Sequence, residues 1–155
     1  MSIAIRLLGA GDDAVLRRVA PEVFDGPVDP RWSAEFLADP RHHIAVALDE
    51  GEVVVGMASA LHYVHPDKAP QLFIDEVAVA PTHQGHGIGR RLMETLLAHG
   101  RTLGCSEAWV LTDDAGNEAA HALYTRTGGR PSPEGSVTMY TFPLGAAERE
   151  GRGRP

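Results

Sequence analysis

A glycine-rich turn joins an apolar strand to an amphipathic helix in the middle of this 155-residue sequence, and this arrangement narrows the possible folds more than any other feature. Leu72–Val79 is rich in apolar and β-branched residues, which favours a strand, and Pro81 ends it because proline donates no ladder hydrogen bond. We predict that a helix begins near Gly87. Its apolar positions follow the 3.6-residue period and predict one buried face: Ile88, Leu92, Met93, Leu96, Leu97 and Leu103.

Three glycines, Gly85, Gly87 and Gly89, keep side chains away from the first turn of that helix. The free N–H groups and the positive dipole end of a helix N-terminus attract phosphate, and Arg90 and Arg91 add positive charge. The spacing, Gln-x-x-Gly-x-Gly, is neither the Walker phosphate loop nor the dinucleotide fingerprint. Taken alone, the glycines allow two interpretations, a phosphate site or a loop that only turns tightly.

The strand, loop and helix together resemble the pyrophosphate-binding motif of the Gcn5-related N-acetyltransferases, a family that binds acetyl-coenzyme A (acetyl-CoA). Gln84, Gly87 and Gly89 match its key positions. The resemblance implies that the loop N–H groups hold the pyrophosphate and that the backbone around Val77 and Val79 binds the pantetheine arm. The cofactor contacts that it implies are Val77, Ala78, Val79, Gln84, Gly85, His86, Gly87, Ile88, Gly89, Arg90, Asn117 and Tyr124.

Two further segments are similar to the aminoglycoside 3-N-acetyltransferases within that family. The segment 114–128 follows an acid-rich turn and contains Ala-Leu-Tyr-Thr-Arg-Thr-Gly, where the family carries Ala-Leu-Tyr-Thr-Lys-Leu-Gly. The strand Phe73–Val79 places Glu76 where the family has an acid before a Leu-Ala-Val run. The Ala-Leu-Tyr portion is common to the superfamily, so the acid pattern is the more discriminating part. The first 70 residues show no motif that identifies a sugar.

The composition bounds the class of protein. A length of 155 residues with 43% hydrophobic residues predicts one domain, and no run of residues is apolar enough for a membrane span. The net charge of −7 argues against nucleic acid and anionic membranes as partners and favours a cationic substrate, although solubility alone explains such a charge too. The start of the chain lacks signal-peptide features, so we expect a cytoplasmic protein. The single cysteine, Cys105, is expected to be a packing residue.

The order of predicted elements indicates an α/β (α+β) fold. We expect strands near 3–7, 44–48, 53–61, 72–79, 107–112 and 137–142, and helices near 14–19, 30–37, 87–103 and 118–127. The resemblance to the Gcn5-related N-acetyltransferases (GNAT) implies a single domain of this family over residues 1–144. We expect it to have a mixed, mostly antiparallel sheet of six to seven strands and about four flanking helices. Residues 145–155 are small, charged and glycine-rich, which predicts a disordered tail. We expect no metal site, because His62 and His65 lack further clustered ligands.

Acetyl transfer to an amine requires a base for the ammonium, a donor for the oxyanion and an acid for the leaving thiolate. Glu76 is the first candidate base and Asp114 the second. Tyr124 is the candidate acid, because a phenol stays protonated at neutral pH and because its position matches the family's thiolate-facing tyrosine. The resemblance implies that a backbone N–H near Val77 meets the oxyanion. The candidate substrate contacts are Asp75, Glu76, Asp113, Asp114, Glu118, Glu22 and Asp25.

The favoured hypothesis is acetyl-CoA-dependent N-acetylation of an aminoglycoside, with the 3-amino group as the candidate position. One alternative is acetylation of another amine, such as a polyamine, an amino acid or a protein N-terminus. A second is a non-catalytic acyl-CoA-binding module, against which the presence of Tyr124 and Glu76 argues, since binding alone needs neither. Each acid also has a plainer interpretation as a solvated charge. A homodimer remains open, because the last predicted strand has the pattern to pair across two subunits.

Overall fold

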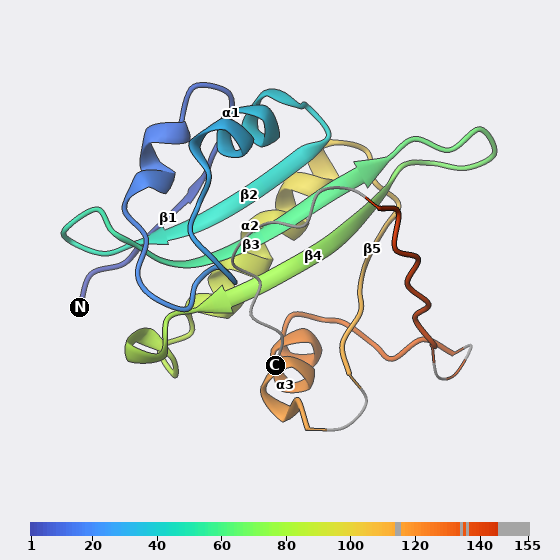
Figure 1. Ribbon diagram of the computed structural model, residues 1–155. Helices are drawn as coiled ribbons and strands as arrows, with labels where there is room; N and C mark the ends of the chain where they lie inside the picture. Colours follow the sequence, from blue (N-terminus) through green and yellow to red (C-terminus); the bar gives the residue numbers. More distant parts are fainter. Residues whose placement is uncertain (114–115, 134, 136, 146–155) are drawn as a thin grey trace.

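A five-stranded sheet forms the centre of the protein, in the order β1-β2-β3-β4-β5 (Figure 1). The computed structural model describes residues 1–113, 116–133, 135 and 137–145. The first four strands are antiparallel to their neighbours, and β5 runs parallel to β4. Their bounds are Ala4–Leu7 (β1), His42–Leu48 (β2), Val54–Tyr63 (β3), Gln71–Val79 (β4) and Glu107–Val110 (β5).

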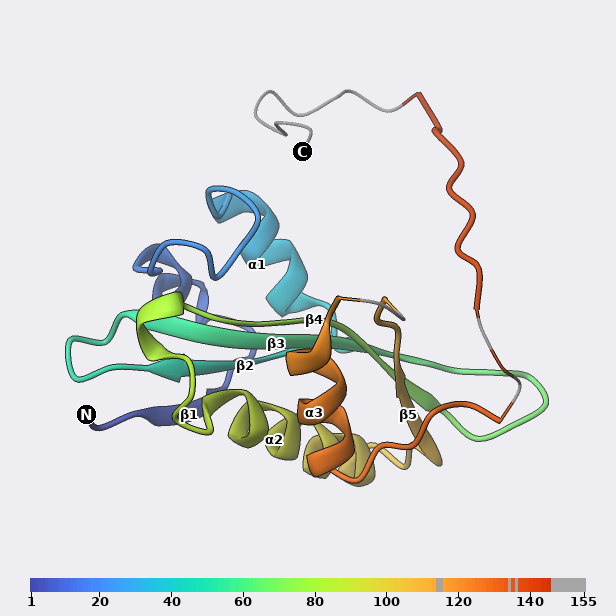
Figure 2. The ribbon, with the colours of Figure 1, turned by 90° about the horizontal axis from the view of Figure 1, so that it is seen from below.

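Helices cover both faces of this sheet (Figure 2). Helix α1 (Pro30–Ala38) and the 3₁₀ helix η1 (Asp13–Arg17) lie on one face. Helix α2 (Ile88–Thr102) crosses the other face, with α3 (Glu118–Arg126) beside it, and the short 3₁₀ helix η2 (Pro81–His83) follows β4. In the described part of the chain, no helix has the length and apolar character needed to cross a membrane.

The predicted starts of two helices are confirmed by their caps. The Asp29 carboxylate accepts hydrogen bonds from the backbone N–H groups of Arg31 and Trp32, at 2.8 and 3.3 Å, and Pro30 follows it. The Asn117 side chain accepts from the Ala120 N–H at 3.4 Å in the same way. These caps satisfy N–H groups that have no partner within a helix, which is why both chain segments begin their helices where the sequence predicted.

Much of the core lies between α2 and the sheet, as the apolar period predicted, and Leu16, Val23 and Leu37 add to it from η1, α1 and the loop between them. Ile88, Leu92, Met93 and Leu96 are each at most 3% exposed. Gly100 on the same helix lies so close to β4 that a Cβ there would stand 2.9 Å from a methyl group of Leu72. Burial of a side chain such as Leu92 contributes about 1.5–3 kcal/mol, so this interface fixes α2 firmly on the sheet.

Two predicted elements differ in the structure. The helix expected near 14–19 is the 3₁₀ helix η1, because Val19 pairs with Val54 and the Val54 N–H donates to the Arg18 carbonyl, so the chain is already extended there. The strand expected at 137–142 is wrong for this structure: these residues form no strand and their apolar side chains are exposed. The α+β class and the mixed, mostly antiparallel sheet are confirmed, with five strands and three α-helices among the described residues rather than six to seven and about four. Of the predicted tail 145–155, only Gly145 lies within the described residues.

Candidate active site

Strands β4 and β5 run together only over their first four residues. The pairing joins Gln71–Ile74 to Glu107–Val110 and stops there. β4 continues to Val79 alongside β3, whereas β5 ends at Val110. Beyond Ile74, the edge of β4 that faced β5 therefore has no strand beside it in the described residues. Within that part of the chain, the backbone N–H and C=O groups of this edge can pair with an extended ligand.

A β-bulge at Asp75 sets which side chains face which side of the sheet. Ile74 pairs with Ala60 and Glu76 pairs with Ser59, so Asp75 is an extra residue in β4. Such a residue interrupts the alternation of side chains, because two residues on one strand oppose one on the other. Asp75 and Glu76 are both exposed, although neighbours in a regular strand point to opposite faces.

The bulge turns Glu76 toward the face that carries α1. Val79 faces α2, since its methyl group lies 3.9 Å from the position of a Cβ on Gly89. Val77 shares that face because it lies two residues from Val79 in the same strand, and Ala78 and Glu76 therefore face the α1 side. The backbone of Val77, Ala78 and Val79 thus separates the α2 side of the sheet, on which the glycine-rich loop before α2 lies, from a carboxylate side.

The glycine loop has the backbone that an anion site requires. Gly85 and Gly87 adopt φ values of +78° and +73°, a conformation that favours glycine, and no atom lies within 4 Å of a Cβ built on either. Gly87 caps α2 without a side-chain hydrogen bond, so the N–H groups of the first turn, at Ile88, Gly89 and Arg90, have no helical partner. The residues present therefore fit a pyrophosphate held by backbone N–H groups.

Side chains around the loop hold it to its neighbours. The Gln84 amide donates to the Val79 carbonyl at 3.0 Å, which ties the loop to the end of β4. His86 Nδ1 lies 3.3 Å from the His83 carbonyl. Arg90 forms an ion pair with Glu94 on the next turn, at 2.7 Å. Gln84 was predicted as a cofactor contact, and this hydrogen bond does not test that prediction.

The start of α3 is fastened to the end of β5. The Asn117 amide donates to the Thr112 hydroxyl at 3.3 Å, and His121 Nε2 lies 2.9 Å from the Asp113 carbonyl. Sequence analysis assigned no role to His121, and its spacing of eight residues from Asp113 carries no signal of this contact. The two interactions hold Thr112 and Asp113, which follow β5, against the start of α3.

Tyr124 lies on α3 and is partly buried against the core. Burial raises the pKa of its phenol above the usual value of 10, because the apolar surroundings disfavour the charged form. Its hydroxyl therefore remains protonated at neutral pH, as the role of a proton donor requires. Leu123, one residue earlier, contacts the position of a Cβ on Gly89 at 3.5 Å, which places α3 beside the first turn of α2.

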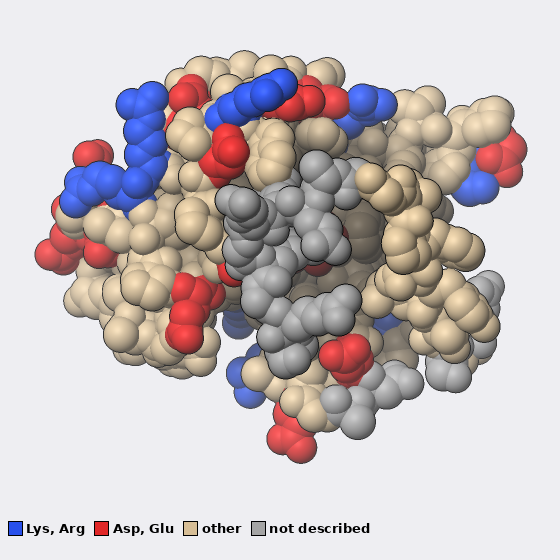
Figure 3. Space-filling model, viewed as in Figure 1, with Lys and Arg blue, Asp and Glu red and all other residues tan. Residues whose placement is uncertain are grey.

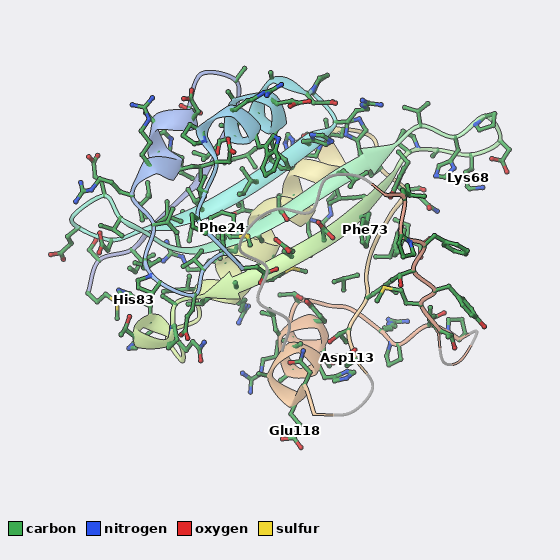
Figure 4. The ribbon with its side chains drawn as sticks, in the orientation of Figure 1. Phe24, Lys68, Phe73, His83, Asp113 and Glu118 are labelled. Atoms are coloured by element: carbon green, nitrogen blue, oxygen red, sulfur yellow. The ribbon has the colours of Figure 1, made fainter. Side chains whose placement is uncertain are left out.

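The predicted acids lie in three different places. Asp75 and Glu76 are on β4, and Asp113 is exposed at the end of β5, while Asp114 lies outside the described residues. Glu118 opens α3 and points away from the sheet (Figure 4). Asp and Glu side chains are spread over the α1 face, from its upper edge to its lower part, and the most prominent Lys and Arg side chains lie at the upper left and along the upper edge (Figure 3).

Glu22 and Asp25 belong to the loop between η1 and α1. Glu22 lines a cavity of about 610 Å³ between this loop, η1 and α1, and Asp25 is exposed but does not line it. No residue of β4 or of the glycine loop lines this cavity. A smaller cavity of about 360 Å³ lies beside the loop and is lined by His86, Ile88 and Arg91 together with the start of the chain. Thus the cavity that Glu22 lines includes neither Asp25 nor the β4 acids.

The sequence analysis did not identify the aromatic pair of Phe73 and Trp109. The rings of Phe73 and Trp109 lie 4.4 Å apart between centroids, on β4 and β5. Phe73 shares the α1 face, since its neighbours Leu72 and Ile74 are buried on the α2 side. The pair therefore lies where the two strands begin to separate. Only the strand register, which the sequence does not display, reveals the pair.

In the described residues, no three His, Cys, Asp or Glu side chains are placed to hold a metal ion.

Comparison with known proteins gives the family. Residues 14–129 match the model of the acetyltransferase (GNAT) family, so the chain belongs to this family of acetyl-CoA-dependent enzymes. A streptothricin acetyltransferase of Streptomyces lavendulae is 34% identical over 117 residues, which are 75% of this chain and 58% of that protein. The chain spans between 25% and 58% of the length of the curated relatives that it matches.

Solved structures of the same fold include aminoglycoside acetyltransferases. One, from an uncultured soil metagenomic sample, has a TM-score of 0.75 and 24% identity, covering 93% of this chain and 99% of that chain. Another, AAC(6')-Iy in complex with a bisubstrate analogue, has a TM-score of 0.74 and 21% identity, covering 92% of this chain and 99% of that chain. At these identities the likeness establishes the fold.

Proposed function

We propose that this protein transfers the acetyl group of acetyl-CoA to a primary amine of an aminoglycoside. The observation that carries the proposal is the division made by β4: an anion-binding loop on the α2 side and exposed carboxylates at the bulge on the other. A ligand that threads the gap between β4 and β5 meets both. A polycationic acceptor suits the carboxylate side, and a pyrophosphate suits the loop.

Each chemical role has a residue in this chain. Acetyl-CoA supplies a thioester, whose carbonyl carbon bonds to the amine nitrogen as the carbon–sulfur bond breaks. Glu76 holds the acceptor ammonium and takes its proton, directly or through a water molecule, since an alkylamine with a pKa near ~10 is charged at neutral pH. The N–H of Val77 stabilises the charge on the carbonyl oxygen. Tyr124 donates its hydroxyl proton to the departing thiolate, and its raised pKa keeps that proton available.

The acceptor is bound by side chains of several elements in this proposal. Asp75 and Asp113 hold further ammonium groups, with Asp114 beside them in sequence. The rings of Phe73 and Trp109 offer an apolar surface against which the face of a sugar ring packs. Glu22 and Asp25 are further candidate contacts from the loop before α1, and Glu118 contributes less because it points away from the sheet.

Two observations favour different amino groups of the aminoglycoside as the site of acetylation. The segments at Glu76 and at 114–128 resemble the 3-N-acetyltransferases, which favours the 3-amino group. One structural neighbour, AAC(6')-Iy, carries the 6' designation in its name. We retain the 3-amino group as the candidate, with the 6'-amino group as the competing outcome of the product analysis.

A second candidate acceptor is streptothricin, because a streptothricin acetyltransferase is 34% identical over three quarters of this chain. The experiment is a steady-state assay of thiol release from acetyl-CoA, with an aminoglycoside panel, streptothricin, polyamines, amino acids and a peptide with a free N-terminus. The proposal predicts the highest kcat/KM for an aminoglycoside, and NMR of the product then gives the acetylated amine. Turnover on another class alone would refute the aminoglycoside proposal and leave the acetyltransferase family assignment intact. Tight acetyl-CoA binding without turnover on any amine would instead favour the binding module.

A further inference from the structure

Three polar side chains are buried in the described part of the protein, and two of them have clear partners. The exposed fractions of Ser33, His43 and Ser59 are 7%, 6% and 9%. The Ser33 hydroxyl donates to the Asp29 carbonyl at 2.9 Å, and His43 lies between two other histidines. Within the same described residues, no group forms a hydrogen bond with the Ser59 hydroxyl. Leaving a buried hydroxyl without a partner costs free energy, so the position of Ser59 needs an explanation.

The Ser59 side chain points to the α1 face of the sheet. A Cβ on Gly56, three residues earlier in β3, would lie 3.3 Å from a methyl group of Ile88 and 3.4 Å from one of Leu92. Gly56 therefore faces α2. Because successive residues of a strand alternate between the two faces, Ser59 faces the opposite side, which is the side that carries Glu76.

The neighbours of Ser59 on this face leave a β4 carboxylate as the polar group beside it. Its neighbours within β2 and β3 are apolar: Ile44, Met57 and Leu61. On β4, Ser59 pairs with Glu76, directly after the bulge at Asp75. The Cβ atoms of such an opposed pair lie roughly 4.5–5.5 Å apart, so one water molecule can bridge a serine hydroxyl and a glutamate carboxylate.

We propose that Ser59 is a positioning residue that holds the water molecule through which Glu76 takes the proton of the acceptor ammonium. The inference rests on the proposed role of Glu76 as the base. As the ammonium N–H bond breaks, its proton goes to the water oxygen and one of the original protons of the water goes to the Glu76 carboxylate. The other original O–H of the water donates to Ser59 Oγ, which fixes the orientation of the water. The step leaves a neutral amine, a water molecule and a protonated Glu76.

The test compares two substitutions of the same shape, Ser59→Thr and Ser59→Val, which differ in whether a hydroxyl is present. The assay is thiol release from acetyl-CoA with the amine that the protein acetylates best. Ser59→Thr should keep kcat within about 2-fold of the wild type, whereas Ser59→Val should lose about 5–10-fold, because the water is no longer held. Coenzyme A affinity in calorimetry should be unchanged in both. Equal kcat in the two variants would overturn the proposal.

Ser59→Ala is the second variant, because it removes the hydroxyl without adding volume to the sheet. It should show the same loss of kcat as Ser59→Val, and wild-type kcat in Ser59→Ala would overturn the proposal. Ser33→Ala is the matched control, since it removes an equally buried hydroxyl from α1. Its kcat should stay at the wild-type value, although the protein loses the hydrogen bond to the Asp29 carbonyl.

A double variant separates this inference from the assignment of the base. If Ser59 acts through Glu76, Ser59→Ala lowers kcat in the wild-type protein and has no further effect in Glu76→Gln. The same loss in both backgrounds would overturn the role of Ser59 and leave Glu76 as the base. Full activity of Glu76→Gln alone would refute the base itself, and this role of Ser59 with it. Because the assay uses the best amine of any class, failure of the aminoglycoside assignment does not affect the result.

Discussion

The two sides of β4 recognise their ligands by different means. On the α2 side, the glycine loop and the first turn of α2 offer backbone N–H groups. A ligand can reach these groups only if the loop residues carry no side chain, as at Gly85 and Gly87. On the α1 side, the ligand would meet side chains: the exposed carboxylates of Asp75 and Glu76 and the ring of Phe73 on β4, and the ring of Trp109 on β5. A backbone site tolerates little variation, whereas a side-chain site can change its ligand by single substitutions. We therefore expect substitutions on the two sides to separate coenzyme binding from acceptor choice.

The largest effect is expected at Gly87, on the backbone side. Gly87→Val places a β-branched residue at φ +73° and fills the space where a phosphate approaches. Coenzyme A affinity should fall by about 100-fold or more in calorimetry, since the left-handed backbone costs roughly 1–2 kcal/mol per residue and the N–H groups are no longer accessible.

Gly104→Val is the control for that experiment. Gly104 has φ +77° with open space around it, but it follows the opposite end of α2. Its substitution should lower stability by a similar amount and leave coenzyme affinity unchanged. Equal losses of affinity in both variants would show that the effect is backbone strain alone, without a phosphate site at the loop.

The next effect concerns the proton donor between the two sides. Tyr124→Phe removes the hydroxyl and keeps the ring, so kcat should fall by about 100-fold while coenzyme affinity changes little. The measurement is steady-state kinetics together with calorimetry. Tyr63→Phe, at the end of β3, is the control and should have wild-type kcat. Unchanged kcat in Tyr124→Phe would remove this residue from the mechanism.

A smaller effect is expected from the carboxylate side. Glu76→Gln removes the base and one ammonium contact, so kcat/KM for the aminoglycoside should fall by about 10-fold or more with coenzyme affinity intact. Glu118→Gln loses a carboxylate that points away from the sheet and should stay near wild type. If both variants lose activity equally, the acceptor response is one of general charge and not of the β4 bulge.

The smallest effect concerns stability and not the two sides of β4. It is expected at a group of histidines near the C-terminal end of α2. His43 is buried between His62 on β3, at 2.8 Å, and His99 on α2, at 3.1 Å. Burial, together with the charges of His99, His62 and His42, lowers the pKa of His43 to about 4, while Asp39 acts in the opposite direction.

This pKa shift predicts the sign of a pH dependence. The unfolded chain binds a proton at His43 near pH 6.5, whereas the folded protein resists it until about pH 4. The stability that neutral His43 provides is thus complete above pH 6.5 and is lost as the pH falls toward 4. The free energy of unfolding is measured in denaturant at pH 7.5 and at pH 5.0, for the wild type and for His43→Leu. The decrease between the two pH values should be smaller in the variant by about 1–2 kcal/mol. Identical losses in both proteins would contradict this account of His43.

The sequence predicted the glycine-loop side of β4 better than the carboxylate side. The strand, glycine loop and helix around Gly87 were predictable, because a left-handed turn and a 3.6-residue apolar period leave direct signals. The direction of Glu76 was not, because it depends on the bulge at Asp75, a property of pairing with β3. The contact of His121 with the Asp113 carbonyl and the pairing of Phe73 with Trp109 likewise depend on residues brought together by the fold.

Residues 137–142 show why alternation alone misled the prediction of a sixth strand. They have the two-residue period of a strand, but a strand needs a hydrogen-bonded neighbour, and these residues have none among the described residues. The alternation indicates which side chains would share a face, but it does not show that a partner strand is present.

The most direct test of acetyl transfer is the mass of an aminoglycoside after incubation with acetyl-CoA and catalytic amounts of the protein. The account predicts a product heavier by one acetyl group, with equimolar thiol released, and strongly reduced product with Tyr124→Phe and Glu76→Gln. An aminoglycoside that keeps its mass, while the protein binds acetyl-CoA and acetylates a different amine, would contradict the assignment of the carboxylate side of β4 to an aminoglycoside.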